Sequence, residues 1–208
     1  MRSDLELLEA WRGGDRAAAG ELFDRHAESI YRFFANKVDR DVEDLVQITL
    51  MACVKGRDRV ADGAHFRAYL FGAARNVLRT YLYKRGRMRE DADLGVSSIC
   101  DLGVGPSTLI AAHEEQRLLL EALRSIPVES QLLLELRYWE ELSTEELALV
   151  FGVPAGTIKS RLSRARKRLE RALSELHSAG AVLESTRTNL DAWAAGLRDQ
   201  VSRIVASR

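Results

Sequence analysis

The residues best suited to chemistry are cations in one segment near the end of the chain. Between Pro154 and Leu173 the sequence carries seven Lys or Arg residues and one acid, Glu170. A helical projection divides this segment into an apolar stripe and a polar face. The stripe comprises Ile158, Leu162, Ala165, Leu169 and Leu173. The polar face comprises Ser160, Ser163, Arg164, Lys167 and Arg171, flanked by Lys159 and Arg161.

A helix with such a face fits the major groove of DNA, where Arg, Lys and Ser side chains can read base edges and flanking cations can hold phosphates. A solvated cationic face is the alternative interpretation. The residues before the helix favour DNA, because Ser143-Thr-Glu-Glu146 fits a capping box and Gly152-Val-Pro154 breaks the chain in front of Ala155. This is the spacing of a helix-turn-helix.

A second basic cluster, between Arg75 and Arg89, holds six Lys or Arg residues and no acid, and aromatic residues lie close to its cations. Cations beside aromatic faces suit single-stranded nucleic acid. We expect the apolar stripe of this helix to comprise Phe66, Leu70, Ala73, Val77 and Tyr81. Arg75, Asn76 and Arg79 fall outside the stripe and are better candidates for DNA contact. The loop 56–63 could receive an extruded base.

These clusters occur in a chain without net charge. Its 208 residues include 31 Lys+Arg and 31 Asp+Glu, and 46% are hydrophobic, which excludes wholesale disorder. Residues 90–107 contain acids, Gly and Pro but no Lys or Arg, and this composition predicts a flexible acidic linker. Because acidic segments could compete with DNA for the basic faces, we expect the free protein to bind duplex DNA weakly.

The elements that position these residues are predicted to be helices, because apolar residues recur at three- and four-residue steps and strand-like alternation is missing. We expect an all-α fold of two small helical domains, 1–89 and 108–177, joined by the flexible linker 90–107. The second domain contains the helix-turn-helix, and an extension over 178–208 follows it. Helices are predicted over 4–11, 16–38, 42–55, 64–84, 107–124 and 127–139, from the Ser143 cap to about 151, and over 155–173.

Neither a membrane segment nor a catalytic site is predicted. No stretch approaches the roughly 18 apolar residues of a spanning helix, and acids near the start argue against a signal peptide, so we expect a cytoplasmic protein without membrane insertion. Cys53 and Cys100 lack a Cys-x-x-Cys or nearby His partner, so no metal or cofactor is expected. A nuclease would need grouped carboxylates or His residues, which are scattered here. We expect His26 to be a hydrogen-bonded core residue.

An acidic segment, 39–47, lies at the start of the third predicted helix. Acids at this position complement the helix dipole, which explains Asp41 and Glu43 adequately. The segment also leaves open a protein partner with a basic surface.

Four motifs taken together closely resemble those of bacterial sigma factors of the extracytoplasmic-function group, group 4 of the sigma-70 family. They are the segments 41–47, 66–78 with its following basic run, 142–148 and 156–166, in order within residues 5–176. The resemblance implies a non-enzymatic factor that binds core RNA polymerase at its clamp helices and flap, recognises minus-10 and minus-35 promoter elements, and helps to open the DNA. An anti-sigma factor is a further candidate partner.

Motif position and the face analysis together give three groups of candidate residues. The polymerase clamp would be contacted by Asp41, Glu43, Asp44, Leu45 and Gln47. The minus-10 element would be contacted by Arg57, Arg59, His65, Arg75, Asn76 and Arg79. The minus-35 element would be contacted by Lys159, Ser160, Ser163, Arg164, Lys167 and Arg171. The family meets the flap near Leu132, Leu133 and Leu136, although periodicity alone assigns these residues to the core.

Two questions stay open at the level of sequence. The alternative function is a helix-turn-helix regulator that acts without replacing the housekeeping sigma factor. Within the extension, apolar residues recur every seven positions and predict an amphipathic helix: Leu183, Leu190, Leu197 and Ile204. It could pack on the second domain, dock a partner or second copy, or hold the DNA-binding surfaces closed.

Overall fold

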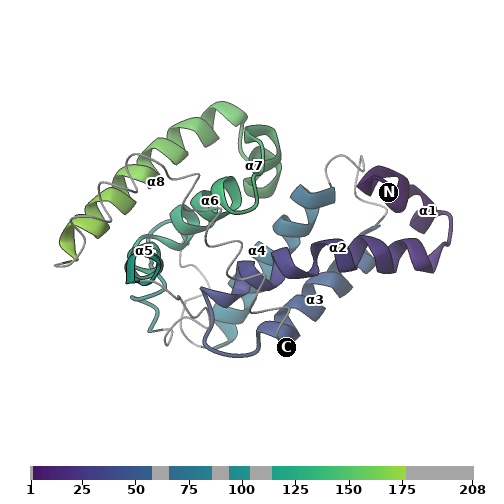
Figure 1. Ribbon diagram of the computed structural model, residues 1–208, viewed down its shortest axis with the longest axis horizontal. Coiled ribbons are helices and arrows are strands. Elements are labelled where there is room, and N and C mark those ends of the chain that lie inside the picture. The colour runs from purple at the N-terminus through teal and green to yellow at the C-terminus, as the bar shows by residue number, and fades with distance from the viewer. Residues whose placement is uncertain (1, 58–65, 86–93, 104–113, 177–208) are drawn as a thin grey trace.

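The computed structural model describes residues 2–57, 66–85, 94–103 and 114–176, and these ranges form eight helices (Figure 1). The helices are α1 (Asp4–Arg12), α2 (Arg16–Ala35), α3 (Val42–Lys55), α4 (Phe66–Lys84), α5 (Glu114–Ser125), α6 (Val128–Tyr138), α7 (Thr144–Phe151) and α8 (Ala155–Glu175). The expected all-α class is confirmed. Among these helices, none has both the length and the apolar character needed to cross a membrane.

The first domain consists of α1–α4, and its first two helices begin at side-chain caps. The backbone N–H of Glu6 donates to Ser3 Oγ (3.3 Å) while the Glu6 carboxylate accepts from the Ser3 N–H (2.6 Å). The Asp15 carboxylate accepts from two N–H groups at the start of α2. Such caps satisfy N–H groups that lack a partner within the helix. His26 of α2 is 6% exposed and its Nε2 lies 2.6 Å from the Asp4 carboxylate, which confirms the expected hydrogen-bonded core histidine.

The buried face of α4 differs from the predicted stripe. Phe66 and Leu70 are buried as expected, but Ala73, Val77 and Tyr81 are only partly buried. The fully covered positions also include Phe71, Ala74, Leu78 and Leu82. The reason is that α4 packs on two sides, against α3 within its own domain and against α7 of the second domain. A single helical stripe does not describe a helix that is covered on two sides.

The second domain consists of α5–α8. Pro127 is the residue before α6 rather than its first helical residue, with an extended ψ of 137°. Ser143 caps α7 through a complete capping box, and Gly152 ends that helix in the left-handed region with φ 65°. Pro154 then precedes the first residue of α8. The predicted helix-turn-helix is therefore present, because a Cβ-free residue allows the left-handed turn between the two helices.

The described part of the linker lies against the second domain. Backbone N–H groups of Val128 and Glu129 donate to the carbonyls of Ser97 (3.0 Å) and Leu94 (2.9 Å). Ile99 is fully buried and Leu94 nearly so. Residues 94–103 are thus held to the α5–α6 junction. The rest of the linker and the C-terminal extension, including its heptad positions, lie outside the described residues.

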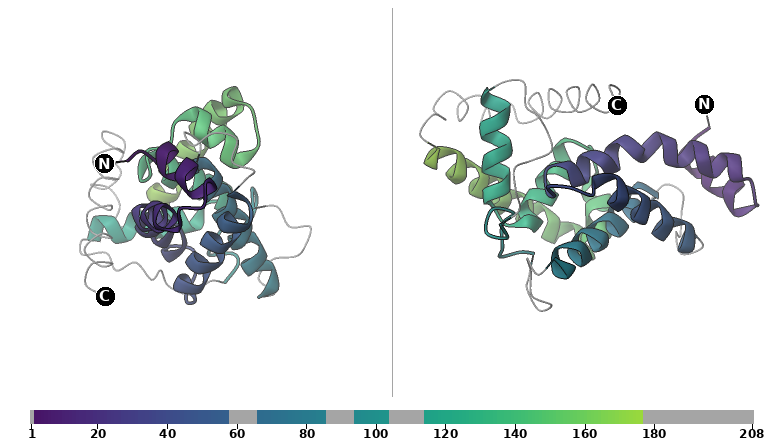
Figure 2. Two further views of the ribbon diagram at one scale, coloured as in Figure 1. Left: turned by 90° about the vertical axis from the view of Figure 1, so that its right-hand side faces the viewer. Right: turned by 90° about the horizontal axis from the view of Figure 1, so that it is seen from below.

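The two domains also pack on each other through α4 and α7. Figure 1 and the right-hand view of Figure 2 show α8 at the outer edge of the second domain, far from α1. Buried apolar side chains of both domains belong to one continuous cluster. The described chain therefore has its two DNA-facing candidates, α4 and α8, on a single packed body.

Candidate nucleic-acid interface

The long helix α8 separates its apolar and polar residues cleanly. Its buried positions are the five predicted ones, Ile158, Leu162, Ala165, Leu169 and Leu173. The six candidates for minus-35 contact are all exposed: Lys159, Ser160, Ser163, Arg164, Lys167 and Arg171. The packed stripe fixes the rotation of the helix, so these side chains share the face that points to solvent.

Three other cations of α8 contact side chains of α6. Arg166 donates to the Tyr138 hydroxyl (2.5 Å), and Arg168 donates to Ser130 Oγ (2.8 Å). Arg161 lies 3.5 Å from the carboxylate of Glu129. These bonds hold the edges of the helix and leave the outward cations available for phosphates or bases.

The minus-10 candidates of α4 differ in exposure. Asn76 and Arg79 are exposed, whereas Arg75 is partly buried. The Arg75 guanidinium forms an ion pair with Glu129 and lies over the ring of Phe151, with 5.5 Å to the ring centroid. Sequence reasoning missed both partners. Glu129 is one of 31 acids, and neither its spacing nor its neighbours mark it.

The loop candidates are described only in part. Arg57, two residues after the end of α3, is partly buried, and its carbonyl accepts from Arg12 Nη2 (3.3 Å). Arg59 and His65 lie outside the described residues. Gly56, which is buried, has the Tyr69 hydroxyl against it, so the start of this loop adjoins an aromatic side chain of α4.

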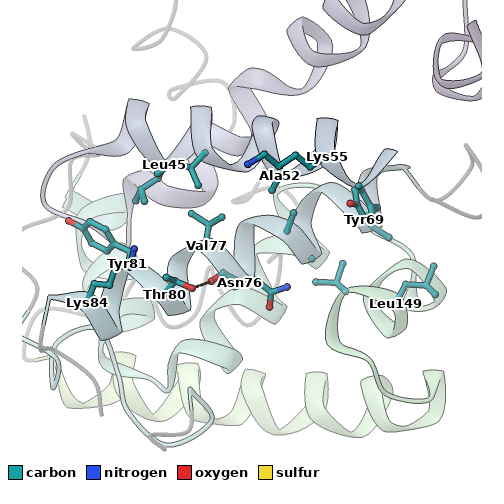
Figure 3. Close-up of a pocket in the computed structure, with 16 residues that line it drawn as sticks. Leu45, Ala52, Lys55, Tyr69, Asn76, Val77, Thr80, Tyr81, Lys84 and Leu149 are labelled. Atoms are coloured by element: carbon teal, nitrogen blue, oxygen red, sulfur yellow. Dashed lines mark hydrogen bonds between the residues drawn. The ribbon is translucent and has the colours of Figure 1, made fainter. Parts of the chain in front are cut away.

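A groove of about 1080 Å³ opens between α3 and α4 and reaches Leu149 of α7 (Figure 3). Asn76 and Tyr69 lie on its α4 wall, with Lys55 and Lys84 also among its lining residues. This groove could not be predicted from the residue pattern, because it depends on how α3 and α4 pack. Aromatic and cationic groups in one groove can contact the bases and the backbone of a single strand.

The clamp candidates on α3 divide into exposed and packed side chains. Glu43, Asp44 and Gln47 are exposed on one side of the first turns, whereas Leu45 is 3% exposed and belongs to the core. Asp41 precedes the helix with φ 65° and makes no side-chain cap. Its carboxylate pairs with Arg85, near the Tyr81 hydroxyl. Asp41 is therefore partly engaged within the first domain.

The candidate flap residues are packed in the second domain. Leu132, Leu133 and Leu136 are at most 2% exposed, as their periodicity predicts. Within the described ranges, no three His, Cys, Asp or Glu side chains lie together in a way that could hold a metal ion.

Each of the two domains contains a segment that matches a known family model. The model for Sigma-70 region 2 matches residues 22–88, and the model for Sigma-70 region 4 matches residues 116–169. The first range begins within α2 and continues through α4, and the second extends from within α5 into α8 and includes the helix-turn-helix. The two matches occur in the order that the motifs indicated.

Whole-chain relatives agree. The ECF RNA polymerase sigma-E factor of Haemophilus influenzae is 25% identical over 183 residues, which cover 84% of this chain and 97% of the relative. The protein of the same name from Escherichia coli K12 is also 25% identical over 183 residues, covering 84% of this chain and 96% of the relative.

Two solved structures share the fold. The sigma factor RpoE in complex with the anti-sigma factor NepR, from Bartonella quintana, has a TM-score of 0.55 at 28% identity, covering 73% of this chain and 93% of that one. CnrH in complex with the cytosolic domain of CnrY has a TM-score of 0.58 at 25% identity, covering 83% and 98%. With both regional models, full-length relatives and the fold in agreement, the chain belongs to the extracytoplasmic-function group of the sigma-70 family.

Proposed function

We propose that this sigma factor reads the minus-35 element with the outward face of α8 and the unpaired minus-10 strand with α4 and the loop before it. The observation that carries the proposal is the division of α8 into a buried apolar stripe and an exposed polar face. All six candidate side chains are exposed, while the opposite stripe is buried in a helix-turn-helix domain. A recognition helix must offer such a face, because base edges are read from within the major groove.

The minus-10 assignment is supported by the surroundings of α4. Asn76 and Arg79 are exposed, and Asn76 lies on the wall of the groove that also contains Tyr69. A base extruded from the opened duplex would find an aromatic side chain and nearby cations there. Promoter opening needs such contacts, since they compensate for the lost stacking of the duplex.

The polymerase assignment is supported by the exposed acids of α3. Glu43 and Asp44 lie in the first turn, where they also favour the helix dipole. They can therefore face a basic surface on the clamp without weakening their own helix. Asp44 is the sharper candidate, because Asp41 already pairs with Arg85.

We further infer that the chain acts as a binding protein without catalytic residues of its own, in the cytoplasm where polymerase and chromosome meet. Because RpoE was solved with the anti-sigma factor NepR, an anti-sigma protein is also a proposed partner of this chain. Such a partner would regulate access to polymerase or promoter.

The direct test is run-off transcription with purified core polymerase and no other sigma factor. The template carries a promoter taken from the transcription start sites that overexpression of this protein induces. We expect a discrete transcript with the wild-type chain. A transcript that appears only when a housekeeping sigma factor is added would instead identify a helix-turn-helix regulator.

Variants assign the surfaces. Arg164→Ala should lose about 1–3 kcal/mol of discrimination against a mutated minus-35 base pair, and Asp44→Ala should weaken co-elution with core polymerase. Arg16→Ala, at an exposed cation on α2 outside both DNA-binding surfaces, is the matched control and should behave as wild type. Loss of minus-35 dependence in the control as well would contradict the assignment to α8.

A further inference from the structure

One carboxylate joins the two DNA-facing elements of the molecule. Oε1 of Glu129, in the first turn of α6, pairs with Arg75 of α4. Oε2 of the same residue lies 3.5 Å from Nη1 of Arg161 on α8. Arg75 is a candidate for contact with the unpaired strand, and Arg161 flanks the reading face of α8. A single acid therefore neutralises a cation from each surface.

The contact of Arg75 goes beyond this ion pair. Its guanidinium also lies over the ring of Phe151, the last residue of α7, with 5.5 Å to the centroid. A guanidinium binds phosphates through its N–H groups and stacks on unpaired bases through its planar face. These are the two parts of Arg75 that contact Glu129 and Phe151. In the packed arrangement its Nη2 pairs with Glu129 and its guanidinium lies over Phe151, so a DNA strand has to compete with both for this side chain.

A second group of charges holds the same two domains together deeper in the interface. Arg32 of α2 makes a two-point contact with Glu140, at 2.9 and 3.0 Å. Lys37 pairs with Glu135, and the amide of Asn36 donates to Glu135 (3.3 Å). Arg32 and Lys37 come from the first domain, whereas both carboxylates come from the second. The two faces are thus complementary in charge, and their ion pairs are almost completely buried.

The contact between the domains nevertheless leaves more buried polar atoms without hydrogen-bond partners than a permanent interface would. Among the described residues, three buried polar atoms at this contact have no hydrogen-bond partner: Asn36 Oδ1, Gln131 Oε1 and Arg75 Nε. Unpaired buried polar atoms and buried ion pairs both carry a cost of desolvation. Burial lowers the pKa of Lys37 even though Glu135 favours its charged form. Such a contact can separate when another partner competes for its charges.

We propose that the packed arrangement is a closed state of the free protein, in which the second domain covers Arg75 and Glu129 ties α4 to α8. The proposal rests on the proposed function, which assigns Arg75 to the minus-10 strand. It explains the weak DNA binding expected of the free chain. It also changes the source of the competing charge, because the one acid that pairs with both Arg75 and Arg161 is Glu129 of α6 rather than an acid of the linker or α3.

The first test measures closure without DNA or polymerase. Spin labels are placed at Gly20→Cys on α2 and Gly156→Cys on α8, where a side chain meets no atom within 4 Å, in a Cys100→Ser background that keeps the buried Cys53. Electron–electron resonance should give one narrow distance distribution for the otherwise wild-type chain. Adding Glu129→Gln and Glu140→Gln should broaden it and extend it to longer distances.

The matched control carries Glu121→Gln and Glu145→Gln, which remove the same charge from exposed positions of the second domain. It should keep the narrow distribution. A broad distribution in the parent chain overturns the closed state. Identical distributions in the interface variant and the control overturn the role of these carboxylates. Neither result depends on transcription, so failure of the sigma-factor assignment would be seen separately in the run-off assay.

The second test uses the partly exposed Glu129 alone, a change that the fold should tolerate. The probe is a fluorescein-labelled 20-nucleotide single strand of mixed sequence. If the open form is on the order of 10% of free molecules, Glu129→Gln should bind it about tenfold more tightly than the charge-matched Glu121→Gln. Adding Arg75→Ala should remove this gain. Equal affinity of the two Gln variants, including no binding by either, overturns the proposal.

Discussion

Lys37, two residues after the end of α2, and Glu135 of α6 form an ion pair that joins the two domains, although their side chains have almost no access to solvent. Lys37 is 0% exposed and Glu135 is 3% exposed. The ammonium group also donates to the carbonyl of Phe33 (2.5 Å) and lies 4.7 Å from the centroid of the Phe33 ring. Its charge is therefore surrounded by partners rather than by water. Removing one partner should cost more than removing the whole pair.

The ion pair gives a prediction for the free energy of unfolding. Glu135→Leu leaves a buried ammonium without its carboxylate. Because the domains can separate and expose Lys37 to water, the cost in urea denaturation should be limited to about 1.4 kcal/mol, the free energy of a tenfold closing equilibrium. The double variant Lys37→Met/Glu135→Leu replaces the pair by apolar groups and should recover most of that loss. Recovery should be incomplete, because the amides of Asn36 and Gln131 also donate to Glu135.

The control for this cycle is Glu21→Leu, which breaks solvent-accessible ion pairs with Arg2 and Arg25 and should change stability much less. Costs of Lys37→Met and Glu135→Leu that simply add in the double variant would show that the two charges do not stabilise each other.

The helix-turn-helix shows what the sequence could predict. Ser143 as a cap, Gly152 as a left-handed end and the apolar period of α8 are local signals, and each determines a boundary or a face by itself. Five of the six outward candidates of α8 follow from that period, and Lys159 flanks them. Their exposure could be predicted because α8 packs on its own domain through one stripe only.

The contacts between domains could not be predicted in this way. Arg32 and Glu140 are 108 residues apart, and an ion pair leaves no periodic trace in the sequence. The buried face of α4 was predicted incorrectly for a related reason. A helix that packs against α3 and α7 at once has a wider covered surface than its strongest stripe, so Phe71 and Ala74 were missed.

Asp4 gives a prediction for the pH dependence of stability. Burial alone would raise the pKa of Asp4, but hydrogen bonds and charges from His26 and Arg25 lower it below its ordinary value of 3.8. The folded state therefore favours the ionised carboxyl. Its contribution is complete well above pH 3.8 and is lost as the pH falls through the lower, folded-state pKa.

Asp4→Asn should accordingly be less stable than wild type near pH 7, by about 1 kcal/mol after allowance for partial exposure. The difference should shrink as the pH falls below 4. Asp24→Asn, at an exposed position on α2, is the control and should stay close to wild type at pH 7. Unfolding curves at several pH values measure both. A deficit of Asp4→Asn that grows on acidification would contradict the assigned sign.

The two cysteines should differ in reactivity. Burial raises the pKa of Cys53 to about 12, and its side chain is inaccessible. Cys100 is exposed, although partial burial also raises its pKa. Since the thiolate is the nucleophile, a maleimide at pH 7.5 should label the native chain once, at Cys100 and more slowly than free cysteine. Mass spectrometry should find no label on native Cys100→Ser, and a label there would show that Cys53 becomes accessible.

Gly56 connects the packing of the first domain to the proposed minus-10 site. A Cβ at this position would lie 1.8 Å from the Tyr69 hydroxyl and 3.4 Å from the carbonyl oxygen of Ala52. Gly56→Ala therefore cannot be accommodated unless the Tyr69 ring moves along the groove. We expect a cost of about 1–3 kcal/mol in stability and weaker opening of the promoter, because Tyr69 would no longer lie where an extruded base could meet it.

Two further variants separate this clash from a general effect of alanine. Gly72→Ala lies on the same groove, where a Cβ meets no atom within 4 Å, and in a helix interior it should stabilise by about 0.5–1 kcal/mol. In a Tyr69→Ala background the obstructing ring is absent, so Gly56→Ala should cost much less than in the wild-type chain. An equal cost in both backgrounds would mean that the strain lies in the backbone beside Ala52. The contact between Gly56 and Tyr69 would then play no part in shaping the site.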